Sequence, residues 1–281
     1  MNDVNSKLAS FPVQTMLGNM FSLDYGLVAS PTITQNSIDL GLRGRVSNPQ
    51  SPSVVSPYRL PPLAKRVREN KMLFGWISDK VINDLLHLIH KSGIAYHAST
   101  KNDPRIGQYL MMRCTKQEKC LGGLLPDSII TSQFRNTESL DITLLTSAPP
   151  LLNVRSDGTA RLNAHVILDL QASTDDKKSI RLAKIKISIQ ATIQGQVQNM
   201  RLVGTVNIND LQLSLIETSL PPIFKDMVEK ELPTLAKPML TSIINDRLAE
   251  GLPIPVTNGV RLVNPEIRLL KHTIQLESDI A

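Results

Sequence analysis

The stretch that decides the fold is SLPPIFKDMVEKELPTLAKPMLTSIINDRLAE, residues 219–250. Its apolar residues recur at intervals of three, four and seven positions, which places them on one face of a helix. They are Ile223, Phe224, Met227, Val228, Leu232, Leu235, Met239, Leu240, Ile243, Ile244 and Leu248. Thr218 or Ser219 can cap the start of this helix, and Gly251 can end it in the left-handed conformation.

A helix of about 30 residues is about 45 Å long, which exceeds the length of an ordinary globular helix. Pro233 and Pro238 lie inside the pattern. Each proline removes a backbone hydrogen bond, so we expect the helix to bend or to split. A rod of this length must lie along something equally long, and the strands that precede it are the only candidates.

The clearest strand pattern comes directly before the long helix. Apolar and polar residues alternate over 161–170, again over 185–193 after a charged turn at 174–178, and in the same style over 197–217. These strands are roughly 10–15 residues long, against a usual five or six. Long alternating strands joined by short polar turns predict an antiparallel meander with one apolar face. Residues 260–280 supply more strand.

A second amphipathic helix is expected over 71–92, with Gly93 at its end. Leu73, Ile77, Val81, Leu85 and Leu88 form one stripe along it. A twisted antiparallel sheet must cover its apolar face, and the two helices are the available cover. The sequence therefore predicts an α+β fold in which a long, strongly twisted antiparallel sheet wraps around the long helix. We expect residues 1–21 to be a linker or the remnant of a preceding domain, and residues 22–281 to form one domain.

Composition and motifs exclude several classes of protein. No apolar run reaches the ~18 residues of a membrane span, and the N-terminus lacks the pattern of a signal peptide. The net charge of +6 and pI of about 9.3 permit attraction to anionic lipid or nucleic acid without requiring either. Nucleic-acid binding is not expected, because only 4% of the residues are aromatic and the single Trp76 falls in the second helix.

Catalytic and metal-binding motifs are absent from the sequence, so we expect neither an enzyme nor a metal or cofactor site. His87 and His90 are three residues apart, and we interpret them as edge residues near a helix C-terminus rather than half of a metal site. The basic run Lys65-Arg66-Val67-Arg68 could contact lipid headgroups or be a cleavage site, although a solvated charge run is the preferred interpretation.

The two cysteines, Cys114 and Cys120, enclose five polar or charged residues. The preferred interpretation is a disulfide across a hairpin tip in an oxidising compartment, and the alternative is two unrelated thiols.

Five ordered motifs carry a resemblance to a known family. They are LDYGLVASPTITQNSIDLGLRGRV (23–46), MLFGWISDKVINDLLHLIHKSGI (72–94), PPLLNVRSDGTARLNAHVILDLQA (149–172), LVGTVNINDLQLSLIETSL (202–220) and NDRLAEGLPIPV (245–256). Together they resemble the C-terminal domain of the family of bactericidal/permeability-increasing protein, lipopolysaccharide-binding protein and the plasma lipid transfer proteins. The second motif matches the family's helix at Gly75, Ile77, Ser78, Asp79, Val81 and Asn83. The cysteine pair departs from the family pattern.

The resemblance implies a half-barrel closed over a long helix, with an apolar cavity that takes the acyl chains of a phospholipid. Periodicity alone leaves open whether the interior is hollow or packed. The residues we expect to line a cavity come from three segments, and ordinary core packing is the alternative for each. They are Tyr25, Leu27 and Val28; Leu73, Ile77, Val81 and Leu85; and Leu235, Met239, Ile243 and Leu248.

The function that the resemblance implies is non-enzymatic binding of phospholipid or a similar amphiphile within an extracellular, secreted defence or lipid-transfer protein. Bound phospholipid would be the only ligand, with no cofactor and no nucleic acid. Contact with lipopolysaccharide or a membrane surface is a further candidate, as is a missing N-terminal domain of the same fold. The alternative from another class is an interaction module that docks a receptor, a lipoprotein or its own N-terminal domain.

Overall fold

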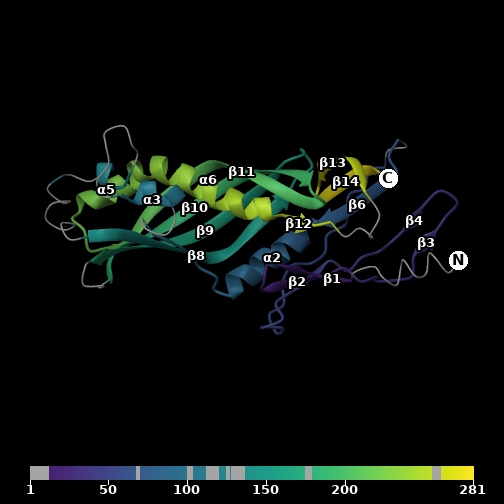
Figure 1. The fold of residues 1–281 in the computed structure, drawn as a ribbon, viewed down its shortest axis with the longest axis horizontal. Helices are drawn as coiled ribbons and strands as arrows, with labels where there is room; N and C mark the ends of the chain where they lie inside the picture. Colours follow the sequence, from purple (N-terminus) through teal and green to yellow (C-terminus); the bar gives the residue numbers. More distant parts are fainter. Residues whose placement is uncertain are drawn as a thin grey trace.

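The computed structural model describes residues 13–67, 70–99, 104–111, 120–124, 127, 137–174, 179–254 and 261–281. The molecule is elongated, and the α+β class is confirmed (Figure 1). Its elements in chain order are β1 (Gln14–Leu17), β2 (Phe21–Asp24), β3 (Thr32–Ile33), β4 (Ile38–Asp39), β5 (Arg45–Ser47), β6 (Leu73–Ser78), α2 (Asp79–Lys91), β7 (Tyr96–Ser99), α3 (Pro104–Leu110), η1 (Gly122–Leu124), β8 (Thr137–Val154), β9 (Ala160–Thr174), β10 (Ser179–Gln198), β11 (Arg201–Thr218), α5 (Ile223–Lys230), α6 (Leu232–Glu250), β12 (Leu252–Pro253), β13 (Leu262–Leu270) and β14 (Thr273–Ile280).

The main sheet is an antiparallel meander of six strands in the order β12-β11-β10-β9-β8-β7. Its four central strands have 18, 15, 20 and 18 residues, so all but β9 are longer than the alternation predicts. The alternation does assign the faces correctly. Ile187, which pairs with Val166 on one side and Leu213 on the other, is fully buried, whereas its neighbours Lys186 and Ser188 face outward.

The long helix is present but split into two, as its prolines predict. α5 ends at Lys230, and Pro233 lies in the first turn of α6, where its missing N–H costs no hydrogen bond. Pro238 stays inside α6, and Gly251 ends it at φ 61°. The expected caps are wrong: Pro222 occupies the cap position of α5 without a side-chain bond, because Thr218 and Ser219 instead donate to the carbonyl of Leu182.

The helix expected over 71–92 is wrong in its first part and confirmed from Asp79 onward. Residues 73–78 form the strand β6, which pairs with β14, and the helix α2 begins only at Asp79. Leu73, Ile77 and Trp76 therefore lie on a strand of the three-stranded sheet β13-β14-β6. The Ser78 hydroxyl accepts the backbone N–H of Lys80 at 3.1 Å, so the serine is the cap that ends the strand and starts the helix.

α2 is fixed to the edge of the main sheet by a buried amide. β7 pairs with β8 only along Asp141–Leu144, so the part of β8 that contains Pro149 and Pro150 has β9 on one side and, among the described residues, no strand on the other. There the Asn83 side chain replaces a strand: its Nδ2 donates to the Leu152 carbonyl at 2.9 Å, and its Oδ1 accepts the Leu152 N–H at 2.8 Å.

One turn earlier, the buried carboxylate of Asp79 joins three elements. Its Oδ2 accepts the backbone N–H of Val154 on β8 at 3.4 Å and lies 2.9 Å from Nδ1 of His272, in the turn between β13 and β14. Asp79 and Asn83 belong to the motif that carries the family resemblance, and their role here is to hold α2, β8 and β14 together.

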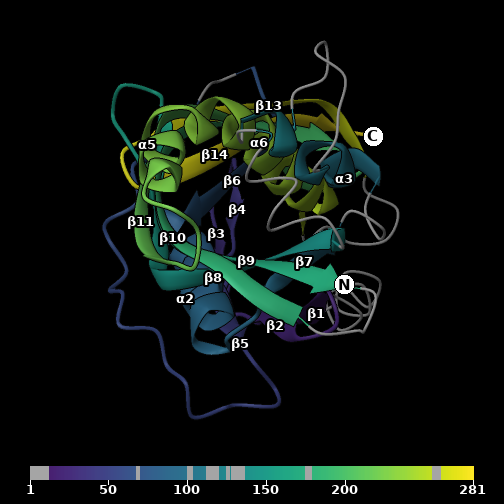
Figure 2. The ribbon, with the colours of Figure 1, turned by 90° about the vertical axis from the view of Figure 1, so that its left-hand side faces the viewer.

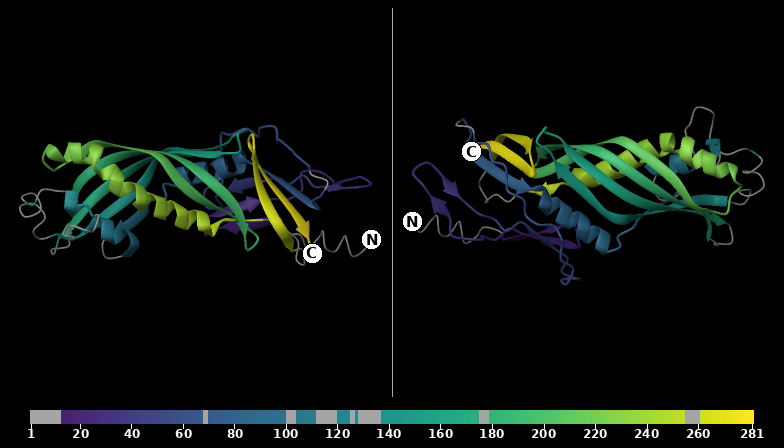
Figure 3. Two further views of the ribbon diagram at one scale, coloured as in Figure 1. Left: turned by 90° about the horizontal axis from the view of Figure 1, so that it is seen from above. Right: turned by 180° about the vertical axis from the view of Figure 1, so that it is seen from behind.

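A small second core lies between α2 and the sheet β1-β2-β5. β1 pairs with β2 over residues 14–17, so these residues of the segment expected to be a linker form a strand of this small sheet. The short hairpin β3-β4 extends from this region away from the main sheet (Figure 3).

The basic run lies against the sheet β13-β14-β6. The backbone N–H of Ala64 donates to Thr273 at 2.9 Å and that of Arg66 to Gln275 at 3.0 Å, while the Lys65 ammonium lies 5.1 Å from the Trp76 ring centroid. Arg68 lies outside the described residues. Because the backbone of the run is bonded to β14, the structure does not favour a cleavage site there.

We expect Asn83→Ala to destabilise the fold. Both backbone groups of Leu152 would lose their partner in a buried place, which costs about 2–4 kcal/mol for the pair. Urea unfolding followed by circular dichroism measures the loss. Asn209→Ala is the matched control, because Asn209 makes its bond to Thr192 on the exposed face and its removal should cost less than about 0.5 kcal/mol. Equal losses in the two variants would contradict the assigned role.

His87 makes the fold sensitive to acid. The ring is buried on α2, and this burial, followed by the positive charges of Lys91 and His90, lowers its pKa below 6.5, while Asp84 opposes the shift. As the pH falls, the unfolded chain therefore takes up a proton on His87 at a higher pH than the folded chain does. The contribution of His87 to the unfolding free energy is present above pH 6.5 and is lost as the pH falls through the lower pKa of the folded state.

We expect His87→Gln to reduce the loss of unfolding free energy between pH 7 and pH 5, as measured by urea titrations at each pH. His97→Gln, at an exposed strand position, is the control and should leave the pH dependence unchanged. A pH dependence that is identical in wild type and His87→Gln would contradict this assignment.

Candidate functional site

The apolar interior lies between the concave face of the main sheet and α6. Viewed along the long axis, the strands β8 to β11 form a curved layer, and α6 and α3 lie on its concave side (Figure 2). The side chains that fill it come from every long strand and from both halves of the split helix, and Phe224, Ile185 and Ile142 are almost completely buried there. This interior is the candidate site, because it is the one place where the long elements all face each other.

A cavity of about 30 Å³ remains within the interior. Its lining residues come from α3 and its neighbour Leu121, from β8 to β11, and from the first half of α6. They are Tyr109, Leu110, Leu121, Ile142, Leu168, Leu170, Ile185, Leu213, Leu232, Leu235, Ala236 and Met239.

The size of this cavity shows that the described side chains leave little free space in the interior. About 30 Å³ has room for roughly two water molecules, so the space as it stands does not hold an acyl chain. Periodicity did not decide between a packed and a hollow interior. The interior seen here is largely packed, whereas the resemblance implies a wide cavity. An acyl chain that binds there would have to displace some of the side chains that line the cavity.

The structure divides the eleven expected lining residues between several places. Leu235 and Met239 line the cavity, and Ile243, Leu248 and Ile77 belong to the same core. Tyr25, Val81 and Leu85 instead belong to the small second core. Leu27 and Val28 are 44% and 60% exposed, so they line no interior, and Leu73 is half-buried on β6.

Sequence reasoning missed most of the strand side of the cavity. Ile142, Leu168, Leu170, Ile185 and Leu213 all lie on inward positions of alternating strands, so the alternation itself carried the signal. The lining residues of α3 had no such signal, because a helix of seven residues is too short to show a period.

Cys120 is disulfide-bonded and buried, and it lies beside the cavity-lining Leu121. Cys114, the other cysteine of the sequence, lies outside the described residues.

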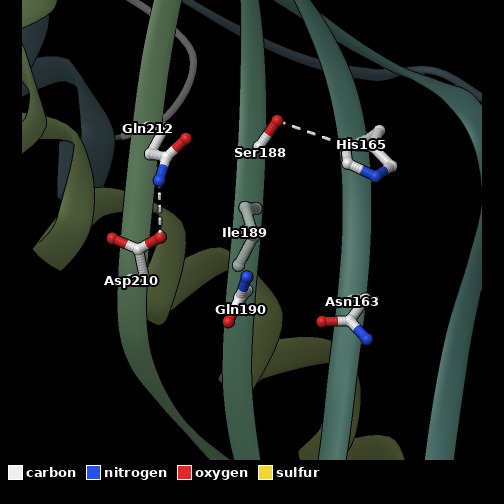
Figure 4. A pocket seen from close by; sticks show the side chains of 7 residues that line it. All are labelled: Asn163, His165, Ser188, Ile189, Gln190, Asp210 and Gln212. Carbon is white, nitrogen blue, oxygen red and sulfur yellow. Dashed lines mark hydrogen bonds between the residues drawn. The ribbon is translucent and has the colours of Figure 1, made fainter.

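A larger hollow lies on the opposite, outward face of the sheet. It measures about 340 Å³ and is lined by Asn163, His165, Ser188, Ile189, Gln190, Asp210 and Gln212 (Figure 4). Its polar side chains already bond to one another: His165 Nδ1 lies 3.2 Å from Ser188 Oγ, and Gln212 Nε2 donates to Asp210 Oδ2 at 3.0 Å. Because the side chains around it are mostly solvated, this hollow does not compete with the apolar interior as the main site.

The described residues contain neither a metal-binding cluster nor a membrane-spanning helix. No cluster of three or more His, Cys, Asp and Glu side chains in the described ranges could hold a metal ion. No helix in that part of the chain has the length and hydropathy needed to cross a bilayer.

Comparison with known proteins gives a consistent result. The model of the LBP / BPI / CETP family, C-terminal domain, matches residues 15–281. Bactericidal permeability-increasing protein of Sebastes schlegelii is 23% identical over 289 residues, covering 100% of this chain and 57% of the relative. BPI fold-containing family C protein of Homo sapiens is 23% identical, covering 99% and 53%, and lipopolysaccharide-binding protein of Bos taurus is 20% identical, covering 99% and 56%.

A crystal structure of lipopolysaccharide binding protein aligns with 99% of this chain and 59% of its own, at 16% identity and a TM-score of 0.46. The chain spans a little over half the length of the curated relatives it matches.

We expect Leu235→Ala to enlarge the cavity and to lower the unfolding free energy by about 2–5 kcal/mol. Leu60→Ala is the control for the same chemical change at a side chain that is 65% exposed, and it should cost less than about 0.5 kcal/mol. Urea unfolding of both variants gives the comparison. A loss at Leu235 no larger than that at Leu60 would mean that α6 is not packed as described.

Proposed function

Since the chain belongs to the LBP/BPI/CETP family, through its C-terminal domain, we propose that it binds the acyl chains of a phospholipid or similar amphiphile between the main sheet and α6. The observation that carries the proposal is the continuous apolar lining, contributed by four long strands and by α3 and α6 around one cavity. The headgroup stays outside, because no charged side chain lines that cavity.

Magnitudes favour a ligand with two acyl chains. Burial of one CH₂ contributes about 0.8 kcal/mol, so roughly 15 buried CH₂ groups contribute about 12 kcal/mol. Association costs about 4–15 kcal/mol in lost freedom of motion, and separation of the packed walls adds to that cost. One chain roughly balances these costs, whereas two chains exceed them. A diacyl phospholipid, or the lipid part of a lipopolysaccharide, therefore suits this interior better than a free fatty acid.

An extracellular setting is part of the proposal. The disulfide at Cys120 supports it, since such bonds persist in oxidising compartments. Relatives named as bactericidal and lipopolysaccharide-binding proteins support a role in defence against bacteria. The net charge of +6 is consistent with this role, because it would attract the chain to an anionic lipid surface. The proposed action is non-covalent, by burial alone.

A second function is favoured by a separate observation. Several large apolar side chains around β3 and β4 lie on the surface. It is unusual for so many such side chains to be exposed in one region. They are Leu27, Val28, Ile33, Ile38, Leu40 and Leu42, with exposed fractions of 44%, 60%, 74%, 66%, 42% and 36%. We propose that this surface docks a second domain, for which the greater length of the relatives leaves room.

Lipid binding is tested by native mass spectrometry of the purified chain after incubation with phosphatidylcholine vesicles. We expect near-stoichiometric lipid in the wild type. Ile243→Asp should abolish it or unfold the chain, because an unpaired buried charge costs several kcal/mol. Ile223→Asp is the matched control, since this side chain on α5 is 54% exposed and should tolerate the charge.

Circular dichroism separates loss of binding from loss of fold in this experiment. A folded Ile243→Asp chain that loads lipid normally would mean that the interior is not the binding site. A wild-type chain that keeps a lipid-free mass would leave only the docking function.

A further inference from the structure

We propose that residues 55–67, which we call the basic strap, dock the protein onto a bilayer that contains anionic phospholipid. The strap belongs to the segment between β5 and β6, which runs over the outside of the molecule (Figure 2). The inference goes beyond the proposed binding of acyl chains, because it assigns a membrane contact to the outer surface. It holds whether or not lipid enters the interior.

The net charge of the protein is concentrated in one stretch of the sequence. Residues 40–68 contain six basic residues and no acidic residue. The chain has 31 basic residues in all, and the other 25 are balanced by its 25 acidic residues. The net charge of +6 therefore belongs to this stretch, and such an asymmetry indicates a surface for an anionic partner.

The cations of the strap are not neutralised by the fold. Arg59, Lys65 and Arg66 are exposed, and none of them forms an ion pair with a described residue. The side chain of Lys71, by contrast, is only 8% exposed, and its ammonium lies 3.3 Å from the carboxylate of Glu266. The fold therefore pairs the neighbouring lysine and leaves three charges of the strap free to attract a partner.

Large apolar side chains lie among these cations. Val55, Leu60 and Val67 are 72%, 65% and 69% exposed. The strap covers no apolar surface on β14 that could take them up, because Thr273 and Gln275, to which its backbone is bonded, are polar and fully buried. Cations interleaved with exposed apolar side chains suit the headgroup boundary of a bilayer, where both kinds of side chain find partners.

The strap presents these side chains on a backbone that the fold holds in place. Near one end, the ring of Tyr58 lies edge-on to the ring of His87 on α2, with 6.0 Å between the centroids. Near the other end, the Gln275 amide accepts the backbone N–H of Arg66 and donates to the carbonyl of the same residue. Because the strap is already ordered, contact with a membrane costs less conformational entropy than the same contact made by a free loop.

The apolar side chains favour a bilayer over a soluble polyanion as the partner. A sulfated polysaccharide would be attracted by the three cations, but it would gain nothing from Val55, Leu60 and Val67. A bilayer with anionic headgroups uses both kinds of side chain, since its phosphates meet the cations and its acyl boundary takes up the apolar groups.

The first test measures co-sedimentation of the full chain with vesicles of phosphatidylcholine, with and without phosphatidylserine. We expect binding to the anionic vesicles that weakens as salt is added, because salt screens exposed charges. Lys65→Gln combined with Arg66→Gln should weaken this binding by about tenfold or more, since each cation near an anionic surface contributes roughly fivefold. Lys186→Gln combined with Lys237→Gln removes the same charge at exposed positions on β10 and α6, and should weaken binding by less than about twofold.

The second test removes the apolar contribution and keeps the charge. Leu60→Ser combined with Val67→Ser should weaken binding to the anionic vesicles by about tenfold or more, because the lost side chains are those that enter the bilayer. Ile216→Ser combined with Ile223→Ser is the matched control, since these side chains are 53% and 54% exposed but lie on β11 and α5. Circular dichroism checks that each variant keeps its fold.

The third test uses the single tryptophan as a local probe. The ring of Trp76 lies 5.1 Å from the Lys65 ammonium, and its Nε1 donates to Gln275 at 2.8 Å, on the face that the strap covers. Brominated phosphatidylcholine in the anionic vesicles should quench the emission of Trp76 in the wild type. The loss of emission should disappear in Lys65→Gln combined with Arg66→Gln.

The outcomes separate this inference from the proposed function. Equal vesicle binding by the strap variants and their controls, or an unquenched Trp76 in the vesicle-bound wild type, would overturn the strap as the docking surface. Heparin binding without vesicle binding would overturn it in favour of a sulfated polysaccharide. A chain that loads lipid but does not bind anionic vesicles would overturn this inference alone, whereas a chain that binds vesicles through the strap but stays free of lipid would overturn only the proposed binding in the interior.

Discussion

The main sheet has one apolar face about as long as its strands, and that face must be covered along its whole length. β8 to β11 have 15–20 residues each, which is several times the size of an ordinary strand, so no single short helix could shield them. The rod made of α5 and α6 meets this demand. Its split at Glu231 allows the two halves to follow the curved sheet, since α5 and α6 both contact β11. The elongated shape and the apolar interior are consequences of this one requirement.

Much of this architecture could be predicted from residue patterns, and the errors have physical reasons. The alternation over β9 and β10 gave the correct faces, because only one register buries Ile185 and Ile187. The assignment of Leu73 and Ile77 to a helix failed because a spacing of four residues places side chains on one face in a strand as well as in a helix. The signal that decides between them was Ser78 followed by Asp79, which is a helix start.

The candidate site was only partly predictable for a different reason. Periodicity identifies an apolar face but does not identify the element that covers it. Leu235 and Val81 have equally clear patterns, yet they belong to two different cores. Leu27 continues the alternation of the buried Leu23 and Tyr25, yet it is 44% exposed. The family motif at Ser78, Asp79 and Asn83 proved to be a structural joint with β8 and β14, because its polar side chains bond to backbone and to His272 rather than face the cavity.

The stretch of β8 that lacks a strand on its β7 side among the described residues has a consequence for how copies of this protein behave beside each other. An open strand edge is a template on which another molecule can add its own strand and begin to aggregate. Pro149 and Pro150 lack the N–H groups that such an addition needs, and the amide of Asn83 already occupies both backbone groups of Leu152. The same features that attach α2 to the sheet therefore also protect a crowded solution of this protein from forming intermolecular sheets along that edge.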